Sequence, residues 1–226
     1  MLYSGCCTCY DERDRNGHKY GRGSMMQSSH ENSRQERVVN AAWEIFARYG
    51  YQKASMQDIA EAAGVSKSVL FKYHGTKENL FRAVFFRAAE EIAAADAEAR
   101  LGKVDGETVF AAMRRTVEAR MRLFARAPYV YAFSYAAAYD ADPLVQSLVA
   151  EAMQRAESVG YGEAAYMGLR EDISPTQAKQ MIFWISQGFL GDKLTQGMAE
   201  PEQLQREFSE WIDIMERLMT EKGIKV

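Results

Sequence analysis

The sequence predicts an all-α protein of about nine helices, in which a small three-helix head precedes a larger helical body. Apolar residues recur at helical spacing along most of the chain, and no stretch shows the alternation that is typical of a β-strand. Between Ser55 and Leu80 three helix starts are crowded around two glycines, Gly64 and Gly75. Two short helices joined by a tight turn at a glycine indicate a helix-turn-helix.

The distribution of charge separates the head from the body. The chain of 226 residues carries a net charge of −3, so it is not a general binder of polyanions. From Ser33 to Arg82, however, there are eight Lys and Arg residues and five Asp and Glu residues. The local charge is therefore +3, which leaves −6 for the rest of the chain. A basic head on an acidic body favours nucleic-acid binding by the head.

Residues 1–30 are expected to be a disordered leader of artificial origin, with the natural start at Met25 or Met26. The leader holds all three cysteines of the chain, Cys6, Cys7 and Cys9. This spacing lacks a fourth metal ligand, so no metal site is expected, and the absence of other cysteines fits a reducing compartment. No apolar run is long enough for a membrane span and no signal peptide is evident, so we expect a cytoplasmic protein without a membrane partner.

The head is expected to span residues 31–86. Its first helix is predicted from Ser33, which forms a capping-box pattern with Glu36, to Tyr49, because Gly50 then breaks the helical pattern. Trp43 on this helix is expected to lie in the core.

Three capping residues start the helices that follow. Ser55 precedes a helix that ends at Gly64, Ser66 can cap a second helix from Lys67 to about Tyr73, and Thr76 can cap a third.

The second of these helices has an unusual surface for a packed helix. Lys67 and Lys72 are cationic, Phe71 and Tyr73 are aromatic, and only Leu70 is clearly suited to the core. Such a helix suits insertion into the major groove of DNA, whereas the alternative is an ordinary solvated helix in a bundle.

The stretch Ala60-Glu-Ala-Ala-Gly-Val-Ser-Lys-Ser-Val-Leu-Phe-Lys-Tyr-His-Gly-Thr-Lys-Glu-Asn-Leu80 resembles the DNA-binding motif of TetR-type transcriptional repressors. The resemblance extends upstream through Ala41–Tyr51 and covers about Arg34 to Phe85. Lys72 stands where His or Tyr is usual in the family, and His74 stands where Phe is usual.

Together, these residues predict a DNA-binding surface. Lys67 and Ser68 are expected to contact base edges, and Lys77 is expected to bind phosphate together with the first amides of its helix. By resemblance, Ser55, Phe71 and Tyr73 lie where family members touch the DNA backbone. The full predicted set is Ser55, Ser66, Lys67, Ser68, Val69, Phe71, Lys72, Tyr73, Thr76 and Lys77.

The body, residues 87–226, is expected to be helical throughout. The helix that starts at Lys77 runs to about Leu101 and crosses the boundary between head and body near Arg87. The later helices are predicted at 107–126, 129–139, 143–159, 163–169, 174–195 and 202–221. Ser174, with Pro at the next position and Gln177 after it, is a clear capping box.

Aromatic residues and methionines in the body favour an adaptable apolar pocket, although most of them are expected in the core. The family resemblance implies an inducer pocket here. Because the sequence offers no cluster of buried charge to pair with an ionic ligand, we expect a small hydrophobic or aromatic effector. The candidate lining residues are Met113, Val117, Met121, Phe124, Tyr131, Tyr135, Trp184 and Gln187.

The last two helices are expected to form a homodimer interface, as the resemblance implies. Glycines 188 and 191 and a broad apolar stripe on the last helix fit close helix contacts between subunits, and packing within one chain is the alternative. The candidate residues are Ile185, Gly188, Phe189, Phe208, Trp211, Ile212 and Met215.

We therefore expect a homodimeric, ligand-responsive transcription regulator without cofactor or metal, a repressor that its effector releases from a palindromic double-stranded DNA operator. One alternative is a DNA-binding regulator controlled by a protein partner instead of a small ligand. The other is a small helical enzyme, which is disfavoured because the chain has no nucleotide-binding loop, no metal-ligand spacing and only three histidines.

Overall fold

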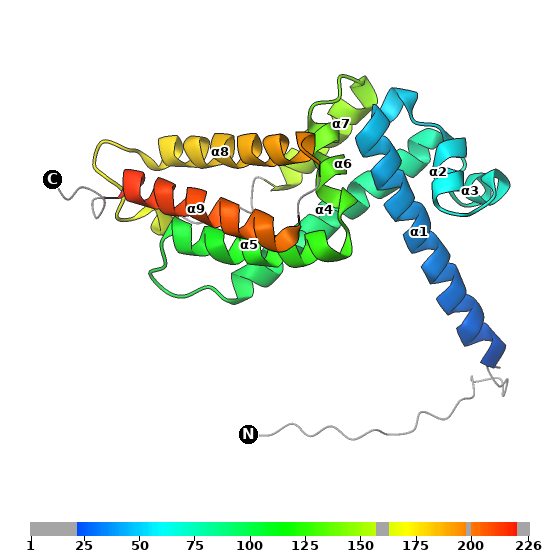
Figure 1. Cartoon of the computed structure of the whole chain (residues 1–226), viewed down its shortest axis with the longest axis horizontal. Helices are drawn as coiled ribbons and strands as arrows, with labels where there is room; N and C mark the ends of the chain where they lie inside the picture. Colours follow the sequence, from blue (N-terminus) through cyan, green and yellow to red (C-terminus); the bar gives the residue numbers. More distant parts are fainter. Residues whose placement is uncertain (1–21, 157–162, 198–199, 221–226) are drawn as a thin grey trace.

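The computed structural model describes residues 22–156, 163–197 and 200–220, and this part of the chain is all-α (Figure 1). It contains nine α-helices and one short 3-10 helix, and within it the only β-type pairing is an isolated bridge between Leu169 and Thr220. The elements are α1 Arg22–Lys53, α2 Met56–Ala62, α3 Lys67–His74, α4 Lys77–Leu101, α5 Val109–Arg126, α6 Tyr129–Ala138, α7 Pro143–Ala156, η1 Glu163–Tyr166, α8 Pro175–Thr195 and α9 Pro201–Met219. The predicted fold class and helix number are confirmed.

Helix α1 starts earlier than the sequence predicted. It begins at Arg22 and runs through Ser33 without interruption, so Ser33 is not a cap and the predicted leader overlaps the helix. Residues 1–21 lie outside the described part. At the other end, Gly50 has φ 69° and ψ 170°, which breaks the helix as predicted, and one further turn follows to Lys53.

The three capping predictions around the helix-turn-helix are confirmed. The side-chain oxygens of Ser55, Ser66 and Thr76 accept hydrogen bonds from the amides three residues ahead. Gly64, with φ 63°, forms the turn between α2 and α3, where a left-handed backbone is required.

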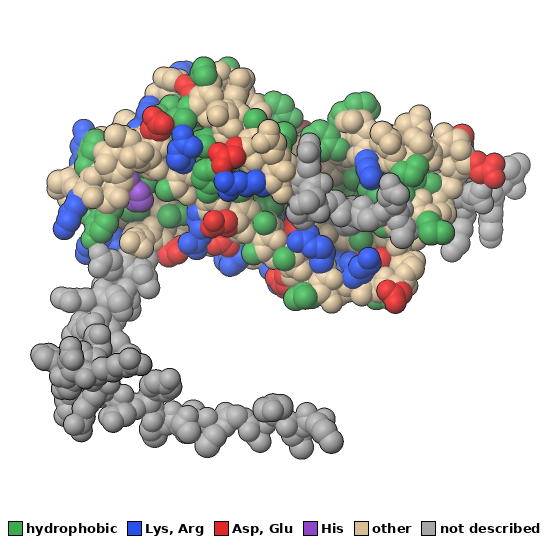
Figure 2. Space-filling model, turned by 180° about the vertical axis from the view of Figure 1, so that it is seen from behind, with side chains coloured by type: hydrophobic (Ala, Val, Ile, Leu, Met, Phe, Trp, Pro, Cys, Tyr) green, Lys and Arg blue, Asp and Glu red, His purple; other side chains and the backbone are tan. Residues whose placement is uncertain are grey.

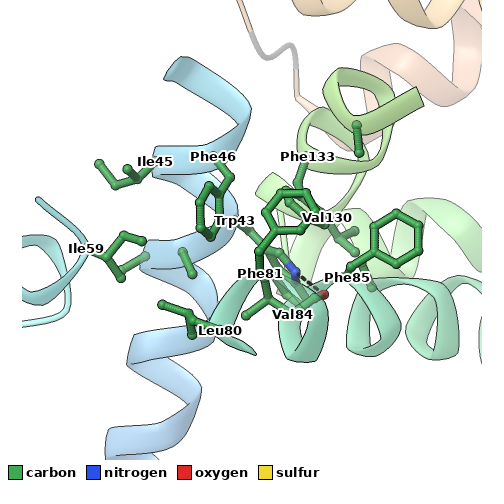
Figure 3. Close-up of a cluster of buried hydrophobic side chains, with 14 of the residues drawn as sticks. Trp43, Ile45, Phe46, Ile59, Leu80, Phe81, Val84, Phe85, Val130 and Phe133 are labelled. Atoms are coloured by element: carbon green, nitrogen blue, oxygen red, sulfur yellow. Dashed lines mark hydrogen bonds between the residues drawn. The ribbon is translucent and has the colours of Figure 1, made fainter. Parts of the chain in front are cut away.

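Head and body share one hydrophobic core, which lies where α1, α4 and α6 meet (Figure 3). The Phe46 ring meets the edge of Phe81 at a centroid distance of 4.8 Å, and Phe81 meets Phe133 at 5.4 Å. Trp43 is buried as predicted, and its Nε1 donates to the Val84 carbonyl at 2.9 Å. The head is therefore anchored on α6 of the body as well as on its own helices.

The loop between α6 and α7 adds polar contacts to this junction. The amide of Tyr51 donates to Asp140 Oδ2 at 3.1 Å, and the side chain of Gln52 donates to Asp142. Asp142 Oδ1 in turn accepts from the amide of Leu144 at the start of α7. The end of α1 is thus held by acidic residues of the body.

The rest of the body is layered on α5 (Figure 1). One side of α5 packs on α4 and the other on α9, while α8 lies along α9 and near η1. Ser174 forms the predicted capping box of α8 with Gln177. In the described ranges, no helix is long and apolar enough to cross a bilayer.

Phe133→Ala tests the shared core. We expect the substitution to lower the free energy of unfolding by about 3–5 kcal/mol, because Phe133 is fully buried and its removal leaves a cavity between head and body. Urea denaturation followed by circular dichroism and by Trp fluorescence measures the change. Leu101→Ala is the control, because this side chain is almost fully exposed. A loss equal to that of the control would contradict a shared core.

Candidate nucleic-acid interface and effector cavity

Helix α3 is attached to the head by one buried side chain. Leu70 is buried, whereas Lys67, Ser68 and Lys72 are exposed to solvent. Phe71 and Tyr73 each keep 42% of their surface exposed, which is unusual for aromatic residues on a short helix. The helix therefore presents a face of cations, hydroxyls and aromatic rings that is largely open to solvent.

Most of the predicted DNA-contacting residues lie on this face or at its edges. The structure leaves seven of them exposed and three half-buried. The exposed residues are Ser66, Lys67, Ser68, Phe71, Lys72, Tyr73 and Thr76, and the half-buried ones are Ser55, Val69 and Lys77.

The exposed cations of α3 lie next to aromatic rings. Lys67 Nζ is 5.8 Å from the centroid of Phe71, and Lys72 Nζ is 5.9 Å from that of Tyr73. The hydroxyls of Ser66 and Ser68 are 3.0 Å apart. Figure 2 shows Lys and Arg side chains at the head end of the molecule, at its left. The surface can offer cations to phosphates and hydroxyl donors to base edges.

The prediction for the side chain of Lys77 is wrong in the structure. Its Nζ donates to the carbonyls of Tyr51, Gln52 and Ala54, at 2.9, 3.1 and 3.3 Å, and lies 4.6 Å from the ring centroid of Tyr51. A cation at the C-terminal end of a helix satisfies carbonyls that have no partner in the helix. Lys77 therefore fastens α4 to the end of α1, and its ammonium does not point to a phosphate site.

Arg37 has a role that the sequence did not predict. Its Nε donates to the Ala63 carbonyl at 3.2 Å, which ties α1 to the turn between α2 and α3. The two residues are 26 positions apart, so no local pattern indicates this contact.

His74 closes α3 and faces the head core in part. It lines a small crevice between α1 and α3 with Val38, Leu70 and Tyr73. Burial lowers the pKa of His74 below its usual value of 6.5, because the charged imidazolium would lose hydration there. An uncharged imidazole ring therefore stands at the position where proteins with this motif usually have Phe.

The body contains a cavity of about 130 Å³ between α5, α6, α8 and α9, here called the inner cavity. Its wall is mainly apolar and includes four predicted residues, Val117, Met121, Phe124 and Tyr131. Burial raises the pKa of the Tyr131 phenol, whose hydroxyl therefore remains a donor. The other lining residues are Arg120, Ser186, Phe189, Leu190, Lys193, Leu194, Leu204 and Phe208.

Four of the predicted pocket residues do not line this cavity. Met113 is buried in a separate cluster under α9, and Trp184 is 63% exposed on the outside of α8. Gln187 also lies outside the lining. Tyr135 packs against Gly191, where an added Cβ would come within 2.2 Å of the Tyr135 hydroxyl. The glycine is thus explained by a close α6–α8 approach inside one chain.

A second, larger cavity of about 560 Å³ lies between α4, α6 and α7, here called the outer cavity. Phe85, Phe86 and Val149 form part of its wall, with Glu90 and Asp96 on the α4 side. Several of its lining residues are solvent-exposed, so it opens to the surface more than the inner cavity does.

The predicted dimer residues fall into three groups. Ile212 and Met215 are buried in the chain's own core against α5, so they are not available to a partner and their prediction is wrong. Phe189 and Phe208 line the inner cavity, and their rings are 4.9 Å apart. Ile185 is half-buried, whereas Gly188 and Trp211 lie open on the surface.

Helices α8 and α9 each expose apolar residues, which are together called the α8–α9 surface here. Trp184 with Gly188 on α8 and Trp211 with Leu218 on α9 follow helical spacing, and Met181 extends the α8 row. Trp211 keeps 46% of its area exposed in the single chain. Large apolar patches of this kind mark interaction sites more often than solvated faces.

Comparison with known proteins places the head in a family. Residues 38–84 match the family described as bacterial regulatory proteins, tetR family. The repressor AcnR of Corynebacterium glutamicum is 43% identical over 53 residues, 24% of this chain and 28% of that protein. The activator FasR of Mycolicibacterium smegmatis is 36% identical over 90 residues, 40% of this chain and 35% of that protein. The chain thus matches only about a third of the length of these relatives.

Solved structures resemble the whole fold at low identity. A TetR family transcriptional regulator from Chloroflexus aurantiacus has a TM-score of 0.59 at 19% identity, over 84% of this chain and 94% of that one. FadR from Bacillus subtilis, solved in complex with stearoyl-CoA, has a TM-score of 0.57 at 16% identity, over 79% and 97%. The matched family and the relatives AcnR and FasR are transcription regulators, which argues against the small-enzyme alternative.

His74 gives the stability of the head a pH dependence. Because its folded-state pKa is lowered, the unfolded chain takes up the proton first, so we expect stability to be complete above about pH 6.5 and to fall as pH drops through the folded pKa. His74→Phe should flatten this fall between pH 7.5 and 5, measured by urea midpoints at each pH. If the unaltered protein and His74→Phe lose the same stability on acidification, His74 is not the source of the pH dependence.

Proposed function

We propose that the chain, whose head matches the TetR family of bacterial regulatory proteins, binds a palindromic operator as a homodimer. It releases this operator when a small, largely apolar effector enters the inner cavity. In this proposal the protein acts as a repressor. Its relatives include both a repressor and an activator.

The proposal that the head binds DNA is supported mainly by the contacts that position α3. Leu70 is its one fully buried residue, Arg37 binds the turn that precedes α3, and Lys77 joins the start of the following α4 to the end of α1. The segments on both sides of α3 are thus anchored, and its outer face is open to solvent. A recognition helix needs both properties, because base readout depends on precise placement of side chains in the major groove.

The α8–α9 surface supports the homodimer. A helix pair that exposes Trp184, Trp211 and Leu218 is suited to a self-complementary interface about a two-fold axis. Gly188 has no atom within 4 Å of the position of an added Cβ, so a helix of the partner could approach closely there. Two heads related by the same axis would read the two halves of a palindrome.

The inner cavity supports effector control. Four of its twelve lining residues are buried and the other eight are half-buried, and it lies beside α6, which carries core contacts to α1. An effector that fits only one arrangement of α6 would shift the equilibrium between head positions by its difference in affinity for the two. Coupling of this kind amounts to about 1–3 kcal/mol.

Lys67→Ala tests base readout by α3. We expect the substitution to cost roughly 1–3 kcal/mol on the preferred DNA sequence and to relax the preference at one position. The preferred sequence comes from selection on a random DNA library, and fluorescence anisotropy gives the affinities. A uniform loss on preferred and random DNA would assign Lys67 to phosphate and contradict base readout.

Lys77→Gln is the matched control, because this cation already binds three backbone carbonyls. It should lower the free energy of unfolding and leave the salt dependence of binding unchanged, because the ammonium binds carbonyls and not a phosphate.

Trp211→Asp tests the dimer. A carboxylate in the centre of an apolar interface would lose hydration, so we expect monomers in analytical ultracentrifugation with unchanged helicity, since Trp211 lies outside the core. Val104→Asp, at a more exposed site between α4 and α5, is the control and should leave the association state as it was. A stable dimer of Trp211→Asp would exclude the α8–α9 surface.

A further inference from the structure

The charged side chains that line the inner cavity are both cations. Arg120 comes from α5 and Lys193 from α8, and no carboxylate is among the lining residues. In an apolar cavity a charged ligand group must be paired, because it loses its hydration on entry. The wall therefore favours an anionic group and disfavours a cationic one.

Arg120 is held in a two-point ion pair that connects α5 with α4. Its Nε donates to Asp96 Oδ1 at 2.8 Å and its Nη2 to Asp96 Oδ2 at 2.9 Å. Asp96 itself lines the outer cavity, so the pair stands between the two cavities with its cation in one wall and its anion in the other. Lys193 is paired with Glu207, with 2.5 Å between nitrogen and oxygen.

We propose that the effector is an amphiphile with an apolar body and an acidic group, and that this acidic group binds Arg120 in competition with Asp96. The proposal rests on the effector function of the inner cavity. When the guanidinium turns to the ligand, α5 loses its two-point bond to α4. Since α4 begins in the head at Lys77, the loss of this bond acts on the same helix that positions the helix-turn-helix.

The competition is physically reasonable because the Arg120–Asp96 pair is only partly buried. The Arg120 side chain is 41% exposed, and ion pairs in contact with water contribute little to stability. A ligand acid held in place by its apolar body is present at a high effective concentration, and it can accept the same two parallel N–H bonds as Asp96. Asp96 would then face the outer cavity, which is open to water.

The first experiment compares octanoate, 1-octanol and octylamine by calorimetric titration of the full chain at pH 7.5. We expect octanoate to bind about tenfold or more tightly than octanol, and octylamine most weakly, because a charge-assisted pair forms only with the acid. Equal binding of octanol and octanoate would overturn the inference and leave the apolar effector cavity intact. Tightest binding of octylamine would point to Glu90 and Asp96 in the outer cavity and would also overturn it.

Two substitutions test the exchange of partners directly. Arg120→Gln should reduce octanoate binding to the level of octanol while octanol binding, which reports an intact cavity, stays the same. Asp96→Asn should strengthen octanoate binding several-fold, because the competing carboxylate is gone. A purely structural role of the pair predicts weaker binding of both compounds in both variants, which would contradict the proposal.

A matched pair on the same helices provides the control. Arg122 of α5 and Glu98 of α4 form an ion pair at 2.9 Å, with the same separation in sequence, and neither lines the inner cavity. Arg122→Gln and Glu98→Gln should leave octanoate binding unchanged, and the same loss in Arg122→Gln as in Arg120→Gln would overturn the assignment. If Lys193→Gln alone removes the preference for the acid, Arg120 is not the binding group.

Failure of the effector function is separable from failure of the inference. If no acid, alcohol or amine of six to sixteen carbons binds the full chain, the effector cavity and the inference fall together. DNA binding by the head, measured with the selected sequence, is independent of that result.

Discussion

The contact on which the rest of the molecule depends is the aromatic cluster of Phe46, Phe81 and Phe133. It joins α1 and α4 of the head to α6 of the body, so that head and body share a continuous core. Because dense packing transmits displacement, α6 cannot shift without a response in α1 or α4. The same two helices hold α2 and α3, and the direction in which α3 faces is therefore set partly from the body.

Short-range patterns in the sequence were sufficient for the helix-turn-helix, although they misplaced the start of α1 at Ser33. Ser55, Ser66 and Thr76 form caps because the oxygen and the amide it satisfies are three residues apart, and Gly64 marks its turn by its own backbone preference. Contacts that join distant segments carry no such pattern. The ammonium of Lys77 reaches carbonyls more than twenty residues earlier, and Arg37 reaches Ala63, so their roles depend on the packed arrangement of α1 against α2 and α4.

The helices of the body show a different limit of prediction from the sequence. Helix α9 has two apolar rows, and periodicity does not tell which one faces α5. In the structure the row with Ile212 and Met215 is buried and the row with Trp211 is exposed. The same ambiguity placed Trp184 in the predicted pocket, although it lies on the outside of α8. The cations of the inner cavity escaped prediction because their acidic partners lie on other helices, far away in sequence.

The hold of the α6–α7 loop on the end of α1 has a consequence for protein engineering. Asp140 accepts a hydrogen bond from the Tyr51 amide, and Asp142 accepts one from the Gln52 side chain. Phe133 completes the hydrophobic core of the head. A chimaera that joins this head to a foreign sensor at the middle of α4 would leave those groups without partners. The smallest unit that can be exchanged therefore includes α6 and its following loop, although more than forty residues separate them from the head in the sequence.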